Sequence, residues 1–476
     1  MTGNPVPPAI SVRDVRFRYL TGPEGSPTEH GLDDLSFEAA PGTLTLMCGP
    51  SGSGKSTALR LLNGLVPGFH GGEFDGAVHV AGVDVPNTPL HDAGRTTATV
   101  FQNPRTGFFN ARVIDEIAFG LENLGLPRAE ILDRVDEAAA VTDVAHLLDR
   151  DIMRLSGGEV QRVATAAAMA AEPRVLLFDE PSSNLSPGAV ADLRALISDL
   201  RGRGVTMVVA EHRLHYLHGL VDQVLYLRDG RIAARFGGEE FFSLDDAARR
   251  DLGLRRLTPT PAREPDPWAC DAPGLRVEGL RFGYGRGTTV LDIGRMDFPA
   301  GRITALTGPN GAGKTTLARV VCGLEKEGRD SAVTLDGERL KPERRRDIAY
   351  IVMQDVARQL FTESVEHEVQ LGLDDVDVPA LLAEVDLAGL EDRHPQSLSG
   401  GQRQRLVIAS AMARRPRICI FDEPTSGVGR EHLLAIGSLM RRLADDGVVV
   451  IVITHDEELI EACADRVVAL PGGGGR

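Results

Sequence analysis

The feature that most constrains this chain is an ordered set of five short motifs that occurs twice. Each set has a Gly-rich loop ending in Gly-Lys-Ser/Thr-Thr, a Gln, a Leu-Ser-Gly-Gly tetrapeptide, an Asp-Glu pair and a late His. The last three motifs recur 243 residues further along the chain, an offset that accidental matches would not keep. We therefore infer an internal duplication at domain scale.

Length and composition fit two soluble domains joined by a linker. The chain has 476 residues, and its apolar runs, such as 44–48, 175–178, 205–210 and 448–453, are short and bounded by polar residues or Gly. Such runs suit buried parallel strands, and none approaches the ~20 residues that cross a bilayer. The N-terminus also lacks a basic segment followed by an apolar one, so we expect a cytoplasmic protein that reaches any membrane through a partner.

The charge and the cysteines argue against two kinds of site. A formal net charge of −16 disfavours a large nucleic-acid interface, because phosphate backbones are bound mainly by clustered Lys and Arg. The five cysteines are scattered without a Cys-x-x-Cys pair, so we expect reduced thiols and neither a zinc nor an iron-sulfur site. We place the first domain at 10–237 and the second at 274–470. The Pro-rich stretch between them, 238–273, is predicted to be a linker, extended around its prolines.

The two Gly-rich loops have the pattern of phosphate loops. Backbone amides of such a loop, which opens a helix, converge on phosphates while the Lys reaches the terminal ones and the hydroxyl binds Mg²⁺. Residues 43–48 and 303–307 are predicted to be the preceding strands, and 57–63 and 316–322 the following helices. The candidate ATP-binding residues are Gly49, Ser51, Gly52, Gly54, Lys55, Ser56 and Thr57 in the first loop, and Gly308, Asn310, Gly311, Gly313, Lys314, Thr315 and Thr316 in the second.

The Asp-Glu pairs follow apolar strands, at the carboxyl edge of a predicted parallel sheet. Asp179 and Asp422 can hold Mg²⁺ there through water. Glu180 and Glu423 can then orient or deprotonate the attacking water as catalytic groups. An Asp-Glu pair alone is usually a solvated turn, and its place after the Leu-Ser-Gly-Gly motif favours the functional interpretation.

The remaining motif residues each have an ordinary structural alternative. The serines of both Leu-Ser-Gly-Gly motifs are plausible helix N-caps, with glycines that leave the helix end open to an anion. The two tyrosines, upstream of the loops, could stack on adenine or simply pack in a strand. A lone His is more often a satisfied structural residue, and only the ordered set favours a γ-phosphate contact. These candidates are Tyr19, Gln102, Ser156, Gly157, Gly158 and His212 in the first set, and Tyr284, Gln354, Ser399, Gly400, Gly401 and His455 in the second.

The whole chain resembles the ABC ATPase superfamily, and Leu-Ser-Gly-Gly is the most specific element of that resemblance. The resemblance implies an α/β fold with two tandem nucleotide-binding domains, each a P-loop RecA-like core with an antiparallel β subdomain and a helical signature subdomain. It implies ATP and Mg²⁺ as cofactors, with the metal near Ser56, Gln102 and Asp179 or near Thr315, Gln354 and Asp422. It also implies that Ser399 and Gly401 complete the site of Lys55, and that Ser156 and Gly158 complete that of Lys314.

Four short stretches are similar to energy-coupling factor transporters, whose ATPases drive uptake of vitamins or transition-metal ions. They are Phe101-Gln102-Asn103-Pro104 with 113–120, Gln354 with 359–365, Glu211-His212-Arg213 in place of Thr-His-Asp, and 67–72. The family's D-loop aspartate is replaced by Ser186 and Gly429, which puts equal hydrolysis at the two sites in doubt. Both candidate catalytic Glu residues are present.

We therefore predict a peripheral ATPase at the cytoplasmic face of the membrane. Its expected partners are an integral membrane scaffold and a substrate-binding membrane subunit, which dock near Gln102 and Gln354 through Phe108, Phe109, Ile114, Ile117, Phe119, Leu360 and Phe361. For Ile117 and Phe119, the core of the helical subdomain is an equally good location. The alternative function is a soluble tandem ABC ATPase that acts on ribosomes. Such proteins typically carry a long charged helical linker, whereas this linker is Pro-rich.

Overall fold

The computed structural model describes residues 7–20, 27–183, 185–284, 289–328 and 330–471. The chain divides into two compact units, Met1–Pro259 and Thr260–Arg476. Their boundary falls inside the stretch that the sequence predicts to be a linker. That stretch also contains two short helices, α8 (Gly238–Phe242) and α9 (Asp246–Asp251), which belong to the first unit.

The centre of the first unit is a six-stranded sheet in the order β10-β9-β3-β8-β7-β6. All neighbouring pairs are parallel except β9 with β10. The strands are β3 (Leu44–Cys48), β6 (Thr97–Val100), β7 (Val175–Asp179), β8 (Thr206–Ala210), β9 (Gln223–Arg228) and β10 (Arg231–Gly237). Strands β3 and β8 are buried throughout, as expected for the continuous apolar runs of a parallel sheet covered on both faces.

A second, antiparallel sheet packs beside this core. Its order is β2-β1-β4-β5, built from β1 (Ile10–Leu20), β2 (Pro27–Ala39), β4 (Gly72–Val80) and β5 (Val83–Asp84). Val12, Val15 and Phe17 of β1 are buried in one cluster with Leu59 and Leu62 of helix α1 (Lys55–Leu62). The antiparallel sheet therefore covers the helix that follows the first Gly-rich loop.

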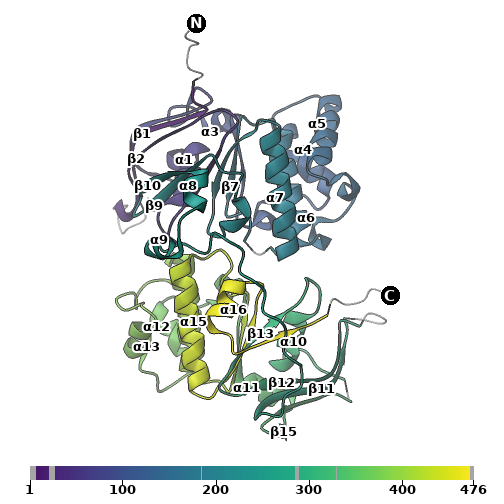
Figure 1. The fold of residues 1–476 in the computed structure, drawn as a ribbon. Coiled ribbons are helices and arrows are strands. Elements are labelled where there is room, and N and C mark those ends of the chain that lie inside the picture. Colours follow the sequence, from purple (N-terminus) through teal and green to yellow (C-terminus); the bar gives the residue numbers. More distant parts are fainter. Residues whose placement is uncertain (1–6, 21–26, 184, 285–288, 329, 472–476) are drawn as a thin grey trace. The chain divides into compact units, whose positions relative to one another are not determined.

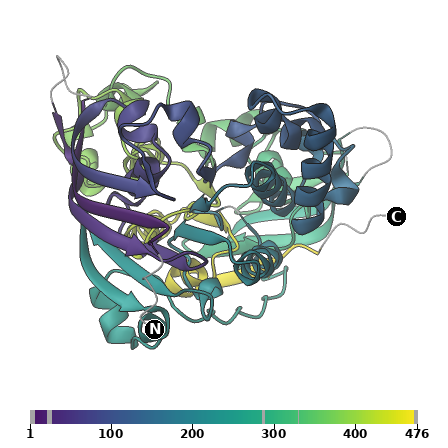
Figure 2. The same ribbon diagram turned by 90° about the horizontal axis from the view of Figure 1, so that it is seen from above.

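The helical part of the first unit lies on the other side of the parallel sheet, as Figures 1 and 2 both show. It is built from α4 (Val113–Asn123), α5 (Arg128–Val141) and α6 (Gly157–Ala170), which share one apolar core. Helix α7 (Pro187–Gly202) packs on the parallel sheet through Val190, Leu193 and Ile197. The short elements are α2 (Leu65–Gly68), α3 (Leu90–Ala93) and the 3-10 turns η2 (Pro104–Gly107), η3 (Ala145–Leu147), η4 (Ile152–Arg154) and η5 (His215–Leu217).

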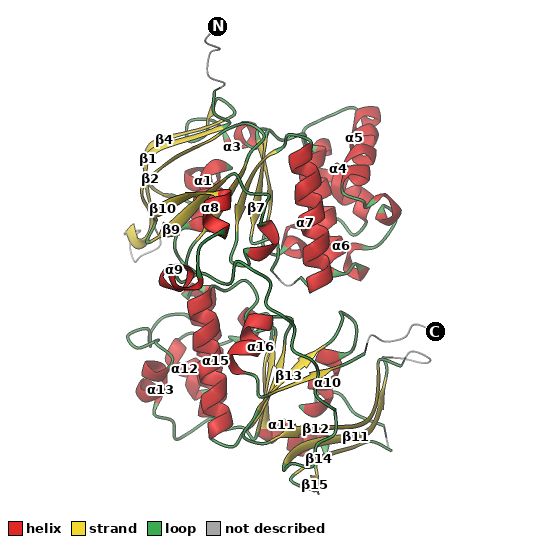
Figure 3. Cartoon of the chain, viewed as in Figure 1, coloured by secondary structure: helices red, strands yellow, loops and turns green. Residues whose placement is uncertain are grey.

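The second unit repeats this plan with a five-stranded parallel sheet in the order β16-β17-β18-β13-β19. Its strands are β13 (Ile303–Thr307), β16 (Ala349–Val352), β17 (Ile418–Asp422), β18 (Val449–Ile453) and β19 (Arg466–Ala469). The antiparallel sheet, yellow in Figure 3, has the order β12-β11-β14-β15. It is built from β11 (Gly274–Phe282), β12 (Leu291–Pro299), β14 (Ala332–Leu335) and β15 (Glu338–Arg339).

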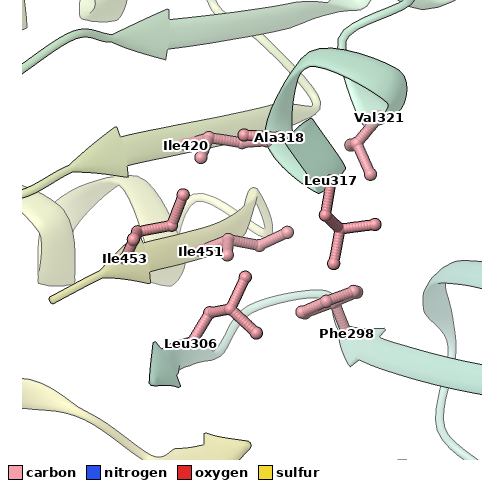
Figure 4. Close-up of a pocket in the computed structure, with 8 residues that line it drawn as sticks. All are labelled: Phe298, Leu306, Leu317, Ala318, Val321, Ile420, Ile451 and Ile453. Atoms are coloured by element: carbon pink, nitrogen blue, oxygen red, sulfur yellow. The ribbon is translucent and has the colours of Figure 1, made fainter. Parts of the chain in front are cut away.

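The helices of the second unit follow the order of those in the first, except that α2, α8 and α9 have no counterpart among the described residues and α16 (Glu457–Cys463) stands in place of η5. They are α10 (Lys314–Val321), α11 (Pro342–Ile348), α12 (Val365–Gln370), α13 (Val378–Glu384), α14 (Gly400–Ala413), α15 (Arg430–Asp445) and α16 (Glu457–Cys463), with 3-10 turns η6 (Val356–Gln359) and η7 (Pro395–Ser397). Figure 4 shows a small gap where α10 packs against the parallel sheet. All eight side chains around this gap are apolar, so it is a packing defect in the core and not a polar binding site.

The Pro-rich segment after residue 259 is fastened to the second unit along β19. Asp266 and Val467 exchange two hydrogen bonds, and the Trp268 indole donates to Ala469 O at 2.9 Å. Neither helix nor strand is present at 257–272. The extended backbone that the prolines predict there stays a prediction. Throughout the described ranges, we find no helix that is both long and apolar enough to cross a bilayer.

The predicted tandem fold, with RecA-like cores, antiparallel β subdomains and helical subdomains, is confirmed. The predicted strands before the two loops match β3 and β13 closely. The helices begin two residues earlier than expected, at Lys55 and Lys314, so both lysines lie in the first turn of a helix.

Candidate functional site

The first Gly-rich loop connects the buried strand β3 to helix α1 in a conformation that needs glycine. Gly49 has φ +142°, and a Cβ placed on it would lie 2.0 Å from Leu227 O. Gly54, the N-cap of α1, has φ +98°. The loop therefore bends tightly over the start of α1, where the first amides of a helix have no partner within the helix and favour an anion.

The second loop has the same geometry. Gly308 has φ +133°, with Leu470 O 2.4 Å from the position of a Cβ, and the N-cap Gly313 has φ +92°. In the first loop, Ser53 Oγ is buried and lacks a hydrogen-bond partner among the described residues. A buried hydroxyl without a partner costs free energy unless a ligand or water satisfies it. These observations fit a phosphate group held by the loop.

The loop lysines fold back over their own loops. Lys55 Nζ donates to Gly49 O at 3.1 Å and to Pro50 O at 2.9 Å. Burial lowers the pKa of this ammonium, and the nearby Glu180 carboxylate opposes that effect. Lys314 Nζ donates to Gly308 O at 2.6 Å and to Pro309 O at 3.1 Å. Each Nζ therefore lies inside the curve of its loop, where it can meet the terminal phosphates.

A hydroxyl and a carboxylate meet beside each loop. Ser56 Oγ donates to Asp179 Oδ1 at 3.0 Å, and Thr315 Oγ1 donates to Asp422 Oδ2 at 3.0 Å. Burial raises the pKa of both aspartates, and the hydrogen bonds from the hydroxyls act in the opposite direction. Hard oxygen donors of these two kinds suit Mg²⁺. In the described ranges, no group of three or more His, Cys, Asp or Glu side chains could hold a metal ion.

The candidate base of the first unit, Glu180, is buried beside the Asp-Ser pair. Its carboxylate accepts a hydrogen bond from Gln102 Nε2 at 2.7 Å and lies 3.5 Å from His212 Nε2. Burial raises its pKa to about 8, the Lys55 ammonium acts against this, and the carboxylates of Glu211 and Asp179 add to it. The structure thus brings Gln102, Glu180 and His212 together, as the sequence predicts.

The second unit has a similar but looser arrangement around Glu423. His455 Nε2 lies 3.9 Å from Glu423 Oε1 and 3.1 Å from Lys314 Nζ. Burial raises the pKa of Glu423 to about 7, and the charge of Asp422 adds to the effect. The side chain of Gln354 is exposed. Glu180 and Glu423 also share a left-handed backbone conformation, with φ of 48° and 49°.

Both candidate adenine-stacking tyrosines lie next to their loops. Tyr19 OH is 3.2 Å from Thr57 Oγ1, and Tyr284 OH donates to Thr316 Oγ1 at 3.5 Å. The Tyr284 side chain is 54 % exposed, so its ring is accessible. Their stacking on adenine stays a prediction, because the contacts place the hydroxyls and not a base.

The signature serines are helix N-caps, as predicted. Ser156 caps α6 and Ser399 caps α14, each in a capping box with the residue three positions later. Space after them is tight: a Cβ on Gly158 would lie 3.0 Å from Ala189 Cβ, and one on Gly401 would lie 2.9 Å from His432 Nε2. The roles of the signature residues Ser156, Gly157, Gly158, Ser399, Gly400 and Gly401 in nucleotide binding stay predictions. Ser186, at the expected D-loop aspartate, caps α7 instead.

An exposed phenylalanine follows each Gln loop. Phe109 and Phe361 are 76 % and 77 % exposed. The turn that carries Phe109 is held by buried Glu116, whose Oε2 accepts from the amides of Phe109 and Asn110 at 2.9 and 2.8 Å. In the second unit, Glu368 Oε2 accepts from the amides of Phe361 and Thr362, both at 2.9 Å. Two equivalent turns thus present an aromatic ring to solvent.

The structure also shows which predicted docking residues are not available. Ile117 and Leu360 are buried, and Phe108 and Ile114 pack partly against the core of the helical part. Phe119 stacks on Phe109, with ring centroids 4.8 Å apart. The sequence gives no role to Glu116 or Glu368. The sequence pattern that could have identified them is an acidic residue in the first turn of a helix, seven positions after a Phe.

Comparison with known proteins agrees with the two-domain reading. The family described as ABC transporter matches residues 32–183 and 291–426. Two proteins of Treponema denticola, each named as an ABC transporter ATP-binding protein, are 40 % and 34 % identical to this chain. The alignments cover 98 % of this chain in both cases and 96 % and 95 % of the relatives. The solved structure of CbiO1 from Clostridium perfringens, described as part of the ABC transporter complex CbiONQ, is 27 % identical, with a TM-score of 0.44 over 51 % of this chain and 94 % of that chain.

Proposed function

This chain belongs to the ABC transporter family, and we propose that it is the ATP-hydrolysing energy-coupling subunit of an importer of the energy-coupling factor type. In this proposal the cargo is a vitamin or a transition-metal ion, taken up through separate membrane subunits. The chain would bind at the cytoplasmic face of the membrane to an integral scaffold subunit, which carries the substrate-binding subunit. The observation that carries the proposal is the matched pair of exposed phenylalanine turns beside the Gln loops.

The nucleotide-binding half of the proposal rests on the groups gathered at each loop. Lys55 and Lys314 would neutralise phosphate charge, and the Ser56–Asp179 and Thr315–Asp422 pairs would hold Mg²⁺. Bound Mg²⁺-ATP supplies the phosphoanhydride bond that is hydrolysed. Glu180 and Glu423 would accept a proton from water, for which a carboxyl pKa raised to about 8 or about 7 is well suited.

The partner-binding half rests on the geometry of the phenylalanine turns. Exposing an apolar side chain such as Phe to water is unfavourable in free energy. Phe109 and Phe361 are nevertheless exposed, and a buried carboxylate accepts a hydrogen bond from the backbone amide of each, which fixes the turn. A rigid exposed aromatic is a common anchor for a partner's apolar groove or helix. The same device in both units favours a partner that docks twice, as a scaffold with two coupling helices would.

Membrane association of the full chain tests the proposal. We expect the tagged chain, recovered from native membranes, to co-purify with integral membrane proteins. Phe361→Asp should release it into the soluble fraction, because a central aromatic anchor is worth about 2 kcal/mol or more and a charge cannot replace it. ATP binding by the purified variant should be nearly unchanged.

The matched control is Leu324→Asp. Leu324 is also an exposed apolar residue of the second unit, 53 % exposed, but it belongs to a different segment, the turn after α10. This variant should stay on the membrane. If Phe361→Asp stays bound as well, or if the chain sediments with ribosomes and never with membranes, the importer proposal is wrong and the ribosome-acting alternative takes its place.

A further inference from the structure

The two units differ at the residues on either side of the late His. In the first unit the sequence is Glu211-His212-Arg213, and in the second it is Thr454-His455-Asp456. The acidic residue therefore precedes His212 but follows His455. The triplet resembles that of other fused ATPases, but this resemblance does not say what Glu211 does. The proposed hydrolysis of ATP does not use Glu211 either.

Glu211 is 2 % exposed, and its carboxylate accepts four hydrogen bonds. Oε1 accepts from the amides of His212 at 2.7 Å and Arg213 at 3.0 Å. Oε2 accepts from the amide of Ser182 at 3.2 Å and from Tyr216 OH at 3.1 Å. Since all four groups are donors, the site is built for an acceptor-only carboxylate.

These contacts connect two segments that carry candidate catalytic groups. Ser182 lies in the turn directly after Glu180. His212 donates its own backbone amide to the Glu211 carboxylate. One carboxylate thus bridges the segment of the base and the segment of the late His, whose side chains lie 3.5 Å apart. A side chain that bridges two such segments fixes the distance between the groups that they carry.

The second unit makes the same connection with a different residue. Asp456 Oδ2 accepts from Thr425 Oγ1 at 2.7 Å, and Thr425 is the counterpart of Ser182. Thr454 occupies the position of Glu211. Its Oγ1 accepts a hydrogen bond from the amide of Asp456, two residues later, at 3.0 Å. The connection is present in both units, but its carboxylate has moved by two positions.

We propose that Glu211 is a positioning residue for ATP hydrolysis at the first loop: its carboxylate holds the turn after Glu180 at a fixed place relative to His212, the part that Asp456 takes in the second unit. This inference rests on the proposed roles of Glu180 and His212. It predicts that the Thr-His-Asp sequence of the second unit can replace Glu211-His212-Arg213 when both flanking residues are changed together, and that changing one of them alone impairs hydrolysis.

Steady-state ATPase kinetics of the full chain test this with three variants, each made together with Glu423→Gln so that only the first loop hydrolyses ATP. Glu211→Gln keeps the shape but turns an amide toward the donors, so kcat should fall roughly tenfold or more toward the value of Glu180→Gln, with KM for ATP changed by less than about threefold. Glu211→Thr should behave similarly. Glu211→Thr combined with Arg213→Asp transplants the arrangement of the second unit, and because Ser182 has a hydroxyl where Thr425 has one, kcat should return to within about threefold of the value of Glu423→Gln alone.

The outcomes separate this inference from the proposed function. If Glu180→Gln itself leaves kcat unchanged, the assignment of the base is wrong and the role of Glu211 falls with it. If Glu180→Gln slows hydrolysis while Glu211→Gln lowers only the melting temperature, Glu211 is structural and the inference alone is wrong. A double variant no faster than Glu211→Thr also overturns it.

A milder variant tests the inference if the Glu211 variants fail to fold, which would be seen as the loss of a cooperative melting transition. Tyr216→Phe removes one of the four donors and leaves the carboxylate and the ring in place. We expect a fall in kcat of about twofold to fivefold with little change in KM. An unchanged kcat in this variant, together with Glu211 variants that do not fold, would leave Glu211 with a structural role only.

Discussion

In the first unit, the side-chain amide of Gln102 donates a 2.7 Å hydrogen bond to the carboxylate of Glu180. The residue that opens the exposed loop is thereby bonded to the candidate base. Phe109 lies on the same connection, between β6 and α4. A partner that moves this loop would change the hydrogen bonding of Glu180 directly, which gives a short physical route from docking to hydrolysis.

Removing this amide should slow hydrolysis. In Gln102→Ala, Glu180 loses a donor that orients its carboxylate. In a chain that also carries Glu423→Gln, so that only the first loop hydrolyses ATP, we expect kcat to fall about tenfold and KM for ATP to change little. The matched control is Asn103→Ala, since Asn103 is the exposed neighbour of Gln102. Equal kinetics of the two variants would show that the hydrogen bond has no part in hydrolysis.

Neutralising either candidate base should separate binding from turnover. Glu180→Gln and Glu423→Gln keep the shape of the side chain but cannot accept a proton. We expect each to retain ATP binding and to slow hydrolysis at its own loop by roughly 10² or more. Equilibrium nucleotide binding and single-turnover hydrolysis measure the two effects. If the double variant hydrolyses ATP at the native rate, the assignment is wrong.

Much of this fold is predictable from the sequence because its signals are local. Runs such as Val449–Ile453 are apolar throughout, as a strand covered on both faces requires, and both Gly-rich loops mark a strand-to-helix junction. The positive φ of Gly49 and Gly308 explains why glycine stands there. The capping roles of Ser156 and Ser399 also follow from short-range sequence, since the box partner is three residues away.

The unpredicted parts depend on contacts between residues that are distant in the chain. In the sequence, Glu211 stands out only as part of the Glu211-His212-Arg213 triplet. The fold brings its carboxylate to the amide of Ser182, which lies 29 residues earlier in the chain. Trp268 lies in a segment that composition marks as a linker, yet its indole bonds to Ala469. Burial likewise separates Leu360, which is in the core, from its neighbour Phe361, which is exposed. Neither periodicity nor spacing distinguishes these two.

Both candidate bases should make hydrolysis increase with pH. Both must lose a proton to act, and burial raises the pKa to about 8 for Glu180 and to about 7 for Glu423. Lys55, Asp179, Glu211 and His212 surround the first carboxylate. As pH rises from 6 to 9, kcat/KM should therefore increase both for Glu423→Gln, which keeps only the first base, and for Glu180→Gln, which keeps only the second. A value of kcat/KM that stays constant or falls over this range would contradict the role of the carboxylate as the base.

The raised pKa of Glu180 also predicts how stability depends on pH. Its folded value of about 8 lies above the usual 4.5, so between these values the folded chain holds a proton that the unfolded chain releases. Its contribution to the free energy of unfolding is present at low pH and is lost as pH rises through about 8. Glu180→Gln removes that loss. We expect this variant to melt above the native chain at pH 9, by roughly 2–4 °C for each kcal/mol, and to show little difference at pH 4. A difference that is larger at pH 4 than at pH 9 has the wrong sign for a buried carboxylate.

Two glycines of the first loop should respond differently to the same substitution. Gly49 has φ +142°, and a Cβ there would lie 2.0 Å from Leu227 O, so Gly49→Ala must displace backbone. Gly52 has φ +80° with no heavy atom within 4 Å of its Cβ position, so Gly52→Ala suffers only the left-handed backbone, about 1–2 kcal/mol. We expect Gly49→Ala to cost more than about 3 kcal/mol and to abolish ATP binding at this loop, and Gly52→Ala to fold with a modestly lower melting temperature. Urea unfolding and nucleotide titration measure both effects, and equal losses for the two variants would mean that the close approach of Leu227 does not determine the shape of the loop.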